Sequence, residues 1–199
     1  GAVVMSPGFR GTPEVYDWWG PMLASVGIIT AIIETNTPED NLEQRKNALI
    51  AGIELIKREN ANSQSPLANK LDESQIAIMG HSLGGGASLR AAEELGDAIK
   101  WVVPLTPYYC ELGQSFEGDL IGVTTPTLII HGEKDDDVPV EQSYLLHRAL
   151  KDLEISTELL IYPREPHGPQ ERNNITDINT RIISWFSKYL SNPFSVQGH

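Results

Sequence analysis

Short apolar runs alternate with longer amphipathic segments along most of the chain. The runs are rich in valine and isoleucine, and glycine, proline or polar residues bound each of them. Nearly continuous apolar runs of this length are typical of parallel strands that are covered on both faces. The pattern predicts strands at 2–5, 28–33, 75–79, 99–105, 127–131 and 157–162.

Amphipathic segments between these runs predict helices at 14–26, 39–59, 84–95, 140–151 and 172–190. The second helix has an apolar face formed by Leu42, Leu49, Ile53 and Ile56. Its charged positions are expected to face water: Asp40, Glu43, Arg45 and Lys46. The repeated alternation of strand and helix predicts an α/β fold, with a mostly parallel sheet of about six strands and helices on both faces. The functional loops of such a fold lie at the carboxyl ends of its strands.

Length and composition are those of one domain. The chain has 199 residues, of which 40% are hydrophobic, and this is enough for one sizeable core. No shift in composition marks a second domain, so we predict a single domain over 1–199, with 191–199 as a flexible tail. Because the sequence opens at once on a strand-like run, we expect that an N-terminal portion of the natural protein precedes it.

The balance of charges disfavours two classes of partner. With 15 Lys and Arg against 27 Asp and Glu, the formal net charge is −12, which repels nucleic acid and anionic membrane surfaces. No apolar stretch approaches the ~20 residues of a membrane-spanning helix. The single cysteine, Cys110, excludes a disulfide within the chain and is expected to be a partly buried thiol. Small neutral or cationic substrates fit the charge, and the oligomeric state stays open.

One short motif carries most of the chemistry. Residues 80–84 read GHSLG, directly after the apolar run 75–79 and before a predicted helix. A G-x-S-x-G motif between strand and helix is typical of a nucleophile elbow, where glycines permit a sharp bend that presents the serine. Ser82 is therefore the candidate nucleophile. The alternative is a glycine-rich turn in which Ser82 caps the helix.

A serine nucleophile needs a base, and an acid that orients the base. In this topology the acid and then the histidine follow the serine along the chain. His167 lies after the strand at 157–162 and is the candidate base. The other histidines have weaker claims: His81 is too close in sequence to Ser82, His131 is expected to be buried and hydrogen-bonded, His147 lies in a helix, and His199 ends the chain.

The candidate acid comes from an acidic turn after the strand at 127–131. Asp135, Asp136 and Asp137 are consecutive there, and only one of them can approach the imidazole. Asp135 is nearest the strand end and therefore the most rigidly placed, so it is the candidate acid. The other two are expected to be solvated or to form a weak cation site. The spacing is not that of a calcium loop, and no cysteine–histidine cluster indicates zinc, so we predict no metal site.

The negative charge that develops on an attacked carbonyl oxygen requires fixed donors. The amide of Leu83, directly after the nucleophile, is one candidate. The loop after the first strand, SPGFRGT, offers the Phe9 amide, with Gly8 permitting the turn. The alternative for Phe9 is a core aromatic on that turn.

Five stretches together resemble the α/β-hydrolase superfamily, and in particular the bacterial cutinases and polyester (PET) hydrolases. They lie at 6–9, 23–37, 80–94, 102–109 and 126–140, with a looser match through His167. The resemblance implies the same roles for Ser82, Asp135 and His167, with Phe9 and Leu83 supplying the oxyanion amides. It also implies an aromatic cleft lined by Phe9, Leu83 and Tyr108, an ester substrate, no cofactor, and secretion.

The sequence departs from this family in several places. Family members usually carry further strands ahead of SPGF and a disulfide near the C-terminus. Tyr109 stands where a histidine is usual, and Asp137, placed at the rim of the substrate site, stands where the residue is usually apolar. An acid there is expected to weaken adsorption on an apolar polymer. The C-terminal part, from 162 to 190, is more similar to esterases and oligopeptidases related to dienelactone hydrolase.

The leading hypothesis is a serine carboxylic-ester hydrolase that forms an acyl-enzyme and needs no cofactor. The first alternative is a small-ester or lactone esterase, or an oligopeptidase-like hydrolase, without activity on polymers. The second is a binding module that keeps the fold but has no catalytic activity.

Overall fold

The computed structural model describes residues 1–109 and 122–189. Cys110 and the tail predicted at 191–199 lie outside these residues. Within them, no helix combines the length and the apolar character that a membrane crossing requires.

A single sheet of six strands organises the described chain, in the order β2-β1-β3-β4-β5-β6. Every neighbouring pair is parallel. The predicted α/β fold with a parallel sheet is therefore confirmed. The strands are β1 (Ala2–Ser6), β2 (Ile29–Ile32), β3 (Ile76–His81), β4 (Val102–Leu105), β5 (Thr127–Gly132) and β6 (Thr157–Tyr162).

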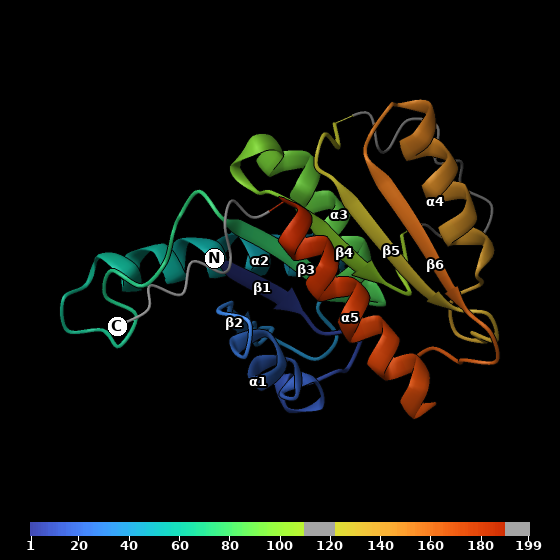
Figure 1. Cartoon of the computed structure of the whole chain (residues 1–199), viewed down its shortest axis with the longest axis horizontal. Helices are drawn as coiled ribbons and strands as arrows, with labels where there is room; N and C mark the ends of the chain where they lie inside the picture. The colour runs from blue at the N-terminus through green and yellow to red at the C-terminus, as the bar shows by residue number, and fades with distance from the viewer. Residues whose placement is uncertain (110–121, 190–199) are drawn as a thin grey trace.

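Helices cover both faces of the sheet (Figure 1). The α-helices are α1 (Trp19–Ala24), α2 (Leu42–Ala61), α3 (Leu83–Leu95), α4 (Glu141–Asp152) and α5 (Arg172–Tyr189). The described residues also form two short 3₁₀ helices: η1 (Pro13–Tyr16) precedes α1, and η2 (Gly96–Ala98) follows α3.

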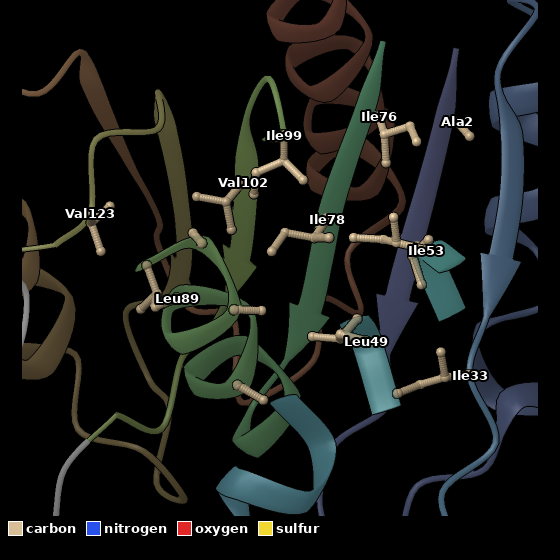
Figure 2. Close-up of a cluster of buried hydrophobic side chains, with 14 of the residues drawn as sticks. Ala2, Ile33, Leu49, Ile53, Ile76, Ile78, Leu89, Ile99, Val102 and Val123 are labelled. Atoms are coloured by element: carbon tan, nitrogen blue, oxygen red, sulfur yellow. The ribbon is translucent and has the colours of Figure 1, made fainter. Parts of the chain in front are cut away.

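Alternating strand residues feed two hydrophobic cores, as expected for a sheet that is covered on both faces. On one face, Val4 and Ile78 pack with Leu49 of α2 and with residues of α3 and α4. Figure 2 shows this core, with Leu49, Ile53 and Leu89 from the helices set against strand residues. On the other face, Val3 and Met79 pack with α1 and α5.

Most predicted elements differ from the observed ones by a few residues at one or both ends, and two of these differences have a local cause. The fourth strand begins at Val102 rather than at 99, because η2 and the turn that closes it occupy the preceding residues. The helix predicted at 14–26 is divided into η1 and α1, since the N–H of Asp17 bonds the carbonyl of Glu14 in a 3₁₀ turn.

The expectation that Asp40 and Arg45 face water is wrong. Both are buried, with relative exposures of 1% and 0%. The Arg45 guanidinium donates to three backbone carbonyls, those of Asp40 (2.9 Å), Pro7 (3.1 Å) and Pro38 (2.9 Å). Hydrogen bonds that replace water permit a buried charge, and here they connect α2 to the loop that follows β1.

The strand order reverses next to β1. The chain places β2 on one side of β1 and then crosses back to place β3 on the other side. Loops that leave the carboxyl ends of two such strands diverge, and the crevice between them is where open α/β sheets bind ligands. In this protein the loops after β1 and β3 carry Phe9 and Ser82.

Candidate active site

Ser82 lies on a strained turn between β3 and α3. Its backbone has φ 56° and ψ −122°, a conformation that costs about 1–3 kcal/mol and persists only where the surroundings enforce it. Its N–H donates to the carbonyl of Leu105 (2.9 Å), and its own carbonyl accepts from the N–H groups of Gly86 (3.1 Å) and Tyr108 (3.0 Å). The backbone around the serine is therefore held from both sides.

Gly80 and Gly84 must be glycines because backbone atoms of other residues lie too close to leave room for a Cβ. A Cβ at Gly80 would overlap the carbonyl oxygen of Gly84, and a Cβ at Gly84 would overlap the carbonyl oxygens of Ser6 and Pro7. The Ser82 hydroxyl makes no capping hydrogen bond to α3. A turn built only to cap a helix would use that hydroxyl, so the arrangement favours the elbow interpretation.

His167 and Asp135 form a hydrogen-bonded pair at the ends of two adjacent strands. Nδ1 of His167 lies 2.8 Å from Oδ2 of Asp135, to which it donates. The other carboxylate oxygen accepts from the amides of Asp137 (3.0 Å) and Val138 (2.8 Å). Because Nδ1 carries the proton, the neutral ring presents Nε2 as an acceptor. The structure thus brings the predicted acid to the predicted base.

The environment of Asp135 keeps its carboxylate ionised. Burial of the side chain acts to raise its pKa, but hydrogen bonds from His131, His167 and the Val138 amide outweigh burial and bring the pKa well below its usual range. His131 is buried, as predicted. Its Nε2–H faces the carbonyl of Val138 (2.9 Å) and Oδ2 of Asp135 (3.2 Å), while its Nδ1 accepts from the hydroxyl of Ser143 (2.6 Å).

A hydrogen-bonded chain that the sequence analysis missed joins the elbow to the predicted base. Nε2 of His81 donates to the carbonyl of His167 (2.8 Å). Nδ1 of His81 must then accept from the Tyr16 hydroxyl (2.9 Å), which itself accepts the N–H of Gly8 (3.2 Å). Burial lowers the pKa of His81 to about 4, so the ring is neutral near pH 7. No motif includes Tyr16, so spacing alone could not reveal this contact.

A buried carboxylate closes the loop that carries His167. Glu165 is 1% exposed, and it accepts from the amides of Gln170 (2.7 Å) and Glu171 (2.9 Å) and from Nδ2 of Asn174 (2.8 Å). These donors lie at the N-terminal end of α5, where a negative charge is favoured. The one sequence signal for this role was an acidic residue just ahead of a predicted helix.

The two predicted oxyanion donors lie beside the elbow and are available. Phe9 is 53% exposed, so the alternative that it is a core aromatic is wrong. Among residues 1–109 and 122–189, no acceptor is bonded to the amide of Phe9 or of Leu83. The Leu83 amide belongs to the first turn of α3, where N–H groups lack partners within the helix.

The remaining predicted site residues lie at the margins of this arrangement. Tyr108 is half-buried, with its amide bonded to the Ser82 carbonyl. Asp137 is exposed, and its carboxylate lies within 4.8 Å of ligand atoms of both Asp135 and His167. The side chains of Asp135, Asp137 and His167 carry atoms that could coordinate a cation. The hydrogen bond between Asp135 and His167, however, already explains why two of the three lie close together.

The contact between the elbow and the predicted base runs through His81 rather than through Ser82 itself. His81, its neighbour in the chain, bonds the backbone of His167, and the two imidazole rings are 4.7 Å apart. In the described part of the chain, no hydrogen bond joins the Ser82 hydroxyl to Nε2 of His167. In enzymes without a bound substrate, such a bond is often long and tightens only when substrate binds.

Comparison with known proteins identifies the family of this arrangement. Residues 1–195 match the family model described as "PETase: PET hydrolase-like". The chain belongs to the PET hydrolase-like family. This result agrees with the resemblance to cutinases and polyester hydrolases seen in the sequence. The likeness of the C-terminal part to dienelactone hydrolase relatives stays a prediction.

Curated relatives align with 70% of this chain. Cutinase est1 of Thermobifida alba is 37% identical over 140 residues, which cover 44% of that protein. Cutinase 1 of Thermobifida cellulosilytica is 38% identical over 141 residues, covering 50% of its length. Bis(hydroxyethyl) terephthalate hydrolase of Streptomyces coelicolor is 34% identical over 140 residues, covering 41%. The chain thus spans half the length, or less, of these relatives.

Proposed function

We propose that the protein is a serine hydrolase of carboxylic esters that uses Ser82, His167 and Asp135. The observation that carries the proposal is the 2.8 Å hydrogen bond between His167 and Asp135 beside a serine on a strained elbow. Membership of the PET hydrolase-like family supports it. So do the names of the relatives, cutinases and a bis(hydroxyethyl) terephthalate hydrolase.

The first proposed step forms an acyl-enzyme. Oγ of Ser82 attacks the ester carbonyl carbon while Nε2 of His167 takes the hydroxyl proton. Asp135 accepts Nδ1–H throughout and stabilises the imidazolium that forms. The carbonyl π electrons move to the oxygen, and this oxyanion binds the amides of Phe9 and Leu83. Two preformed donors lower the barrier because they need no rearrangement when charge develops.

The second half of the reaction releases both products. Nε2–H of His167 protonates the leaving alcohol oxygen as the carbon–oxygen bond breaks, leaving the acyl group on Ser82. A water molecule then gives a proton to His167 and attacks the acyl carbon, and the serine leaves with the proton returned. These steps use only water and groups of the chain itself.

The proposed substrates are small aliphatic or aryl esters, with polyesters as an extension. Phe9, Leu83 and Tyr108 are proposed to form the cleft for the substrate. The exposed carboxylate of Asp137 at its rim disfavours adsorption on an apolar surface. Rates on a p-nitrophenyl ester, an aryl polyester film, a lactone and a peptidyl amide separate the polyesterase from its alternatives. In Asp137→Asn, the ratio of film to small-ester hydrolysis should rise.

The decisive experiment compares Ser82→Ala with Ser63→Ala, a matched change at an exposed loop serine. Ser82→Ala should lose p-nitrophenyl acetate hydrolysis by at least ~10³-fold while its circular dichroism stays that of the wild type. Ser63→Ala should retain full activity. A fluorophosphonate should label the wild type at Ser82. A folded protein that neither hydrolyses esters nor reacts with the probe would instead be the binding module.

A further inference from the structure

A pocket of about 440 Å³ lies on the α1/α5 face of the sheet, next to the histidine pair. We call it the tryptophan pocket. Its walls include Tyr16, Trp18, Trp19 and His81, with Gly168 and Ile175 on the side of the His167 loop and α5. Phe9, Leu83 and Tyr108 are not among the described residues that line it. The tryptophan pocket is therefore separate from the cleft assigned to the substrate above.

The walls of the tryptophan pocket suit an apolar group. Trp19 and Ile178 are almost fully buried, and the rings of Trp18 and Trp19 stack with centroids 4.1 Å apart. The polar groups of Tyr16 and His81 are already bonded to each other and to backbone atoms. A charged ligand would find no free partner on these two side chains, whereas a hydrocarbon group would leave water for an apolar surface.

The position of the tryptophan pocket connects it to the leaving group of the reaction. His81 directly precedes Ser82, and Gly168 directly follows His167. In the proposed mechanism the leaving alcohol oxygen meets Nε2 of His167, so the alcohol extends from the ester toward the histidine side of the site. Gly168 is one of the residues that line the pocket, and a Cβ built there meets no atom within 4 Å, so a larger side chain can be introduced beside the base without a clash at its Cβ.

We propose that the tryptophan pocket binds the apolar part of the leaving alcohol, an aromatic ring in particular. This rests on the proposed ester hydrolysis and names the alcohol side of its substrates. Its volume of about 440 Å³ lies within the range of small-molecule sites, roughly 300–1,000 Å³. The exposed side chains of Val15 and Trp18, at 63% and 41%, form its outer part.

The first test measures kcat/KM for ethyl acetate and benzyl acetate, which share one acyl group. Burying a phenyl ring should favour the benzyl ester by ~10-fold or more in the wild type. Val15→Asp places a charge in the outer part of the pocket, and Gly168→Leu fills its wall beside the base. Both should bring the benzyl-to-ethyl ratio to within ~3-fold of unity. Leu145→Asp, which adds the same charge at a 53% exposed position of α4, should keep the wild-type ratio.

A second series holds ethanol as the alcohol and enlarges the acyl group. Its relative rates should be the same in Val15→Asp and in the wild type. A loss confined to the acyl series would overturn the assignment to the alcohol. An unchanged benzyl-to-ethyl ratio in both pocket variants would refute the proposal that the tryptophan pocket binds any part of the substrate.

A binding measurement separates this proposal from the proposed activity. Benzyl alcohol should quench the tryptophan fluorescence of Ser82→Ala through Trp18 and Trp19, and the added change Val15→Asp should weaken that binding at least ~5-fold, whereas Leu145→Asp should not. Equal titrations in all three proteins would refute the pocket. Quenching without ester hydrolysis by the wild type would refute the catalytic proposal and keep the binding site.

Discussion

The pKa of His81, the partly buried histidine that precedes the nucleophile, leads to a quantitative prediction about stability and pH. Burial lowers the pKa of His81 to about 4 in the folded protein, against about 6.5 in an unfolded chain. Between pH 6.5 and pH 4, His81 is therefore mostly protonated in the unfolded state and mostly neutral in the folded state. The free energy of unfolding should fall with pH from about 6.5 down to about 4.

The size of the effect follows from the two pKa values. Between pH 8 and pH 5, His81 should cost the folded state about 2 kcal/mol, and the full difference below pH 4 is about 3 kcal/mol. The surrounding ionisable groups contribute to this pKa. Next to burial, which dominates, the hydrogen bond to the His167 carbonyl and the charges of Asp135 and Asp137 act to raise it, while His167 lowers it.

The assay is urea unfolding of the wild type and His81→Gln at several pH values from 8 to 5. A glutamine amide can donate to the His167 carbonyl and accept from the Tyr16 hydroxyl, but it does not titrate in this range. The difference between the two proteins isolates His81 from the other groups that titrate. Parallel curves for the two proteins, or an NMR titration giving His81 a pKa near 6.5, would refute the reasoning.

Three further predictions concern the site and its support. Asp135→Asn should lower kcat on a small ester by ~10³–10⁴-fold because the imidazole loses its orientation and its charge partner, whereas Asp136→Asn, at an exposed position, should stay near wild type; equal losses in ester assays would contradict the assignment. Gly84→Ala should destabilise the fold by about 2–3 kcal/mol, since its Cβ would overlap the backbone of Ser6 and Pro7. Gly20→Ala, whose Cβ meets nothing within 4 Å, should not destabilise it, and urea unfolding of both variants checks the contrast. Tyr16→Phe should cost about 1–3 kcal/mol because the Gly8 amide and His81 Nδ1 lose their partner, and a melting temperature equal to that of the wild type would disprove this.

The sequence predicted the structure best where the residue types of a segment and its place in the fold agree. Apolar runs gave all six strands because strands that are buried on both faces leave few polar positions. Ser82, Asp135 and His167 could be chosen as candidates because each follows a strand, and parallel strands end at the same edge of the sheet.

The sequence was least informative about long-range polar contacts. Arg45 looked like a solvated helix residue, yet its partners are carbonyls of Pro7 and Pro38, which only the folded chain brings to it. Tyr16 and Glu165 also act through backbone atoms of other segments. Because almost every residue carries backbone donors and acceptors, the pattern of residue types does not indicate which of them a distant side chain will bond.

The buried guanidinium of Arg45 has a consequence for attempts to redesign the protein. An arginine side chain stays protonated at any pH at which proteins remain folded. Here the guanidinium donates a hydrogen bond to the carbonyl of Pro7, two residues before the Phe9 amide. The position of the Phe9 amide therefore depends on a side chain in the first turn of α2. A lysine at this position would offer one compact charge for carbonyls that a planar fork now spans. Engineering of the cleft would therefore begin by leaving this distant helix start untouched.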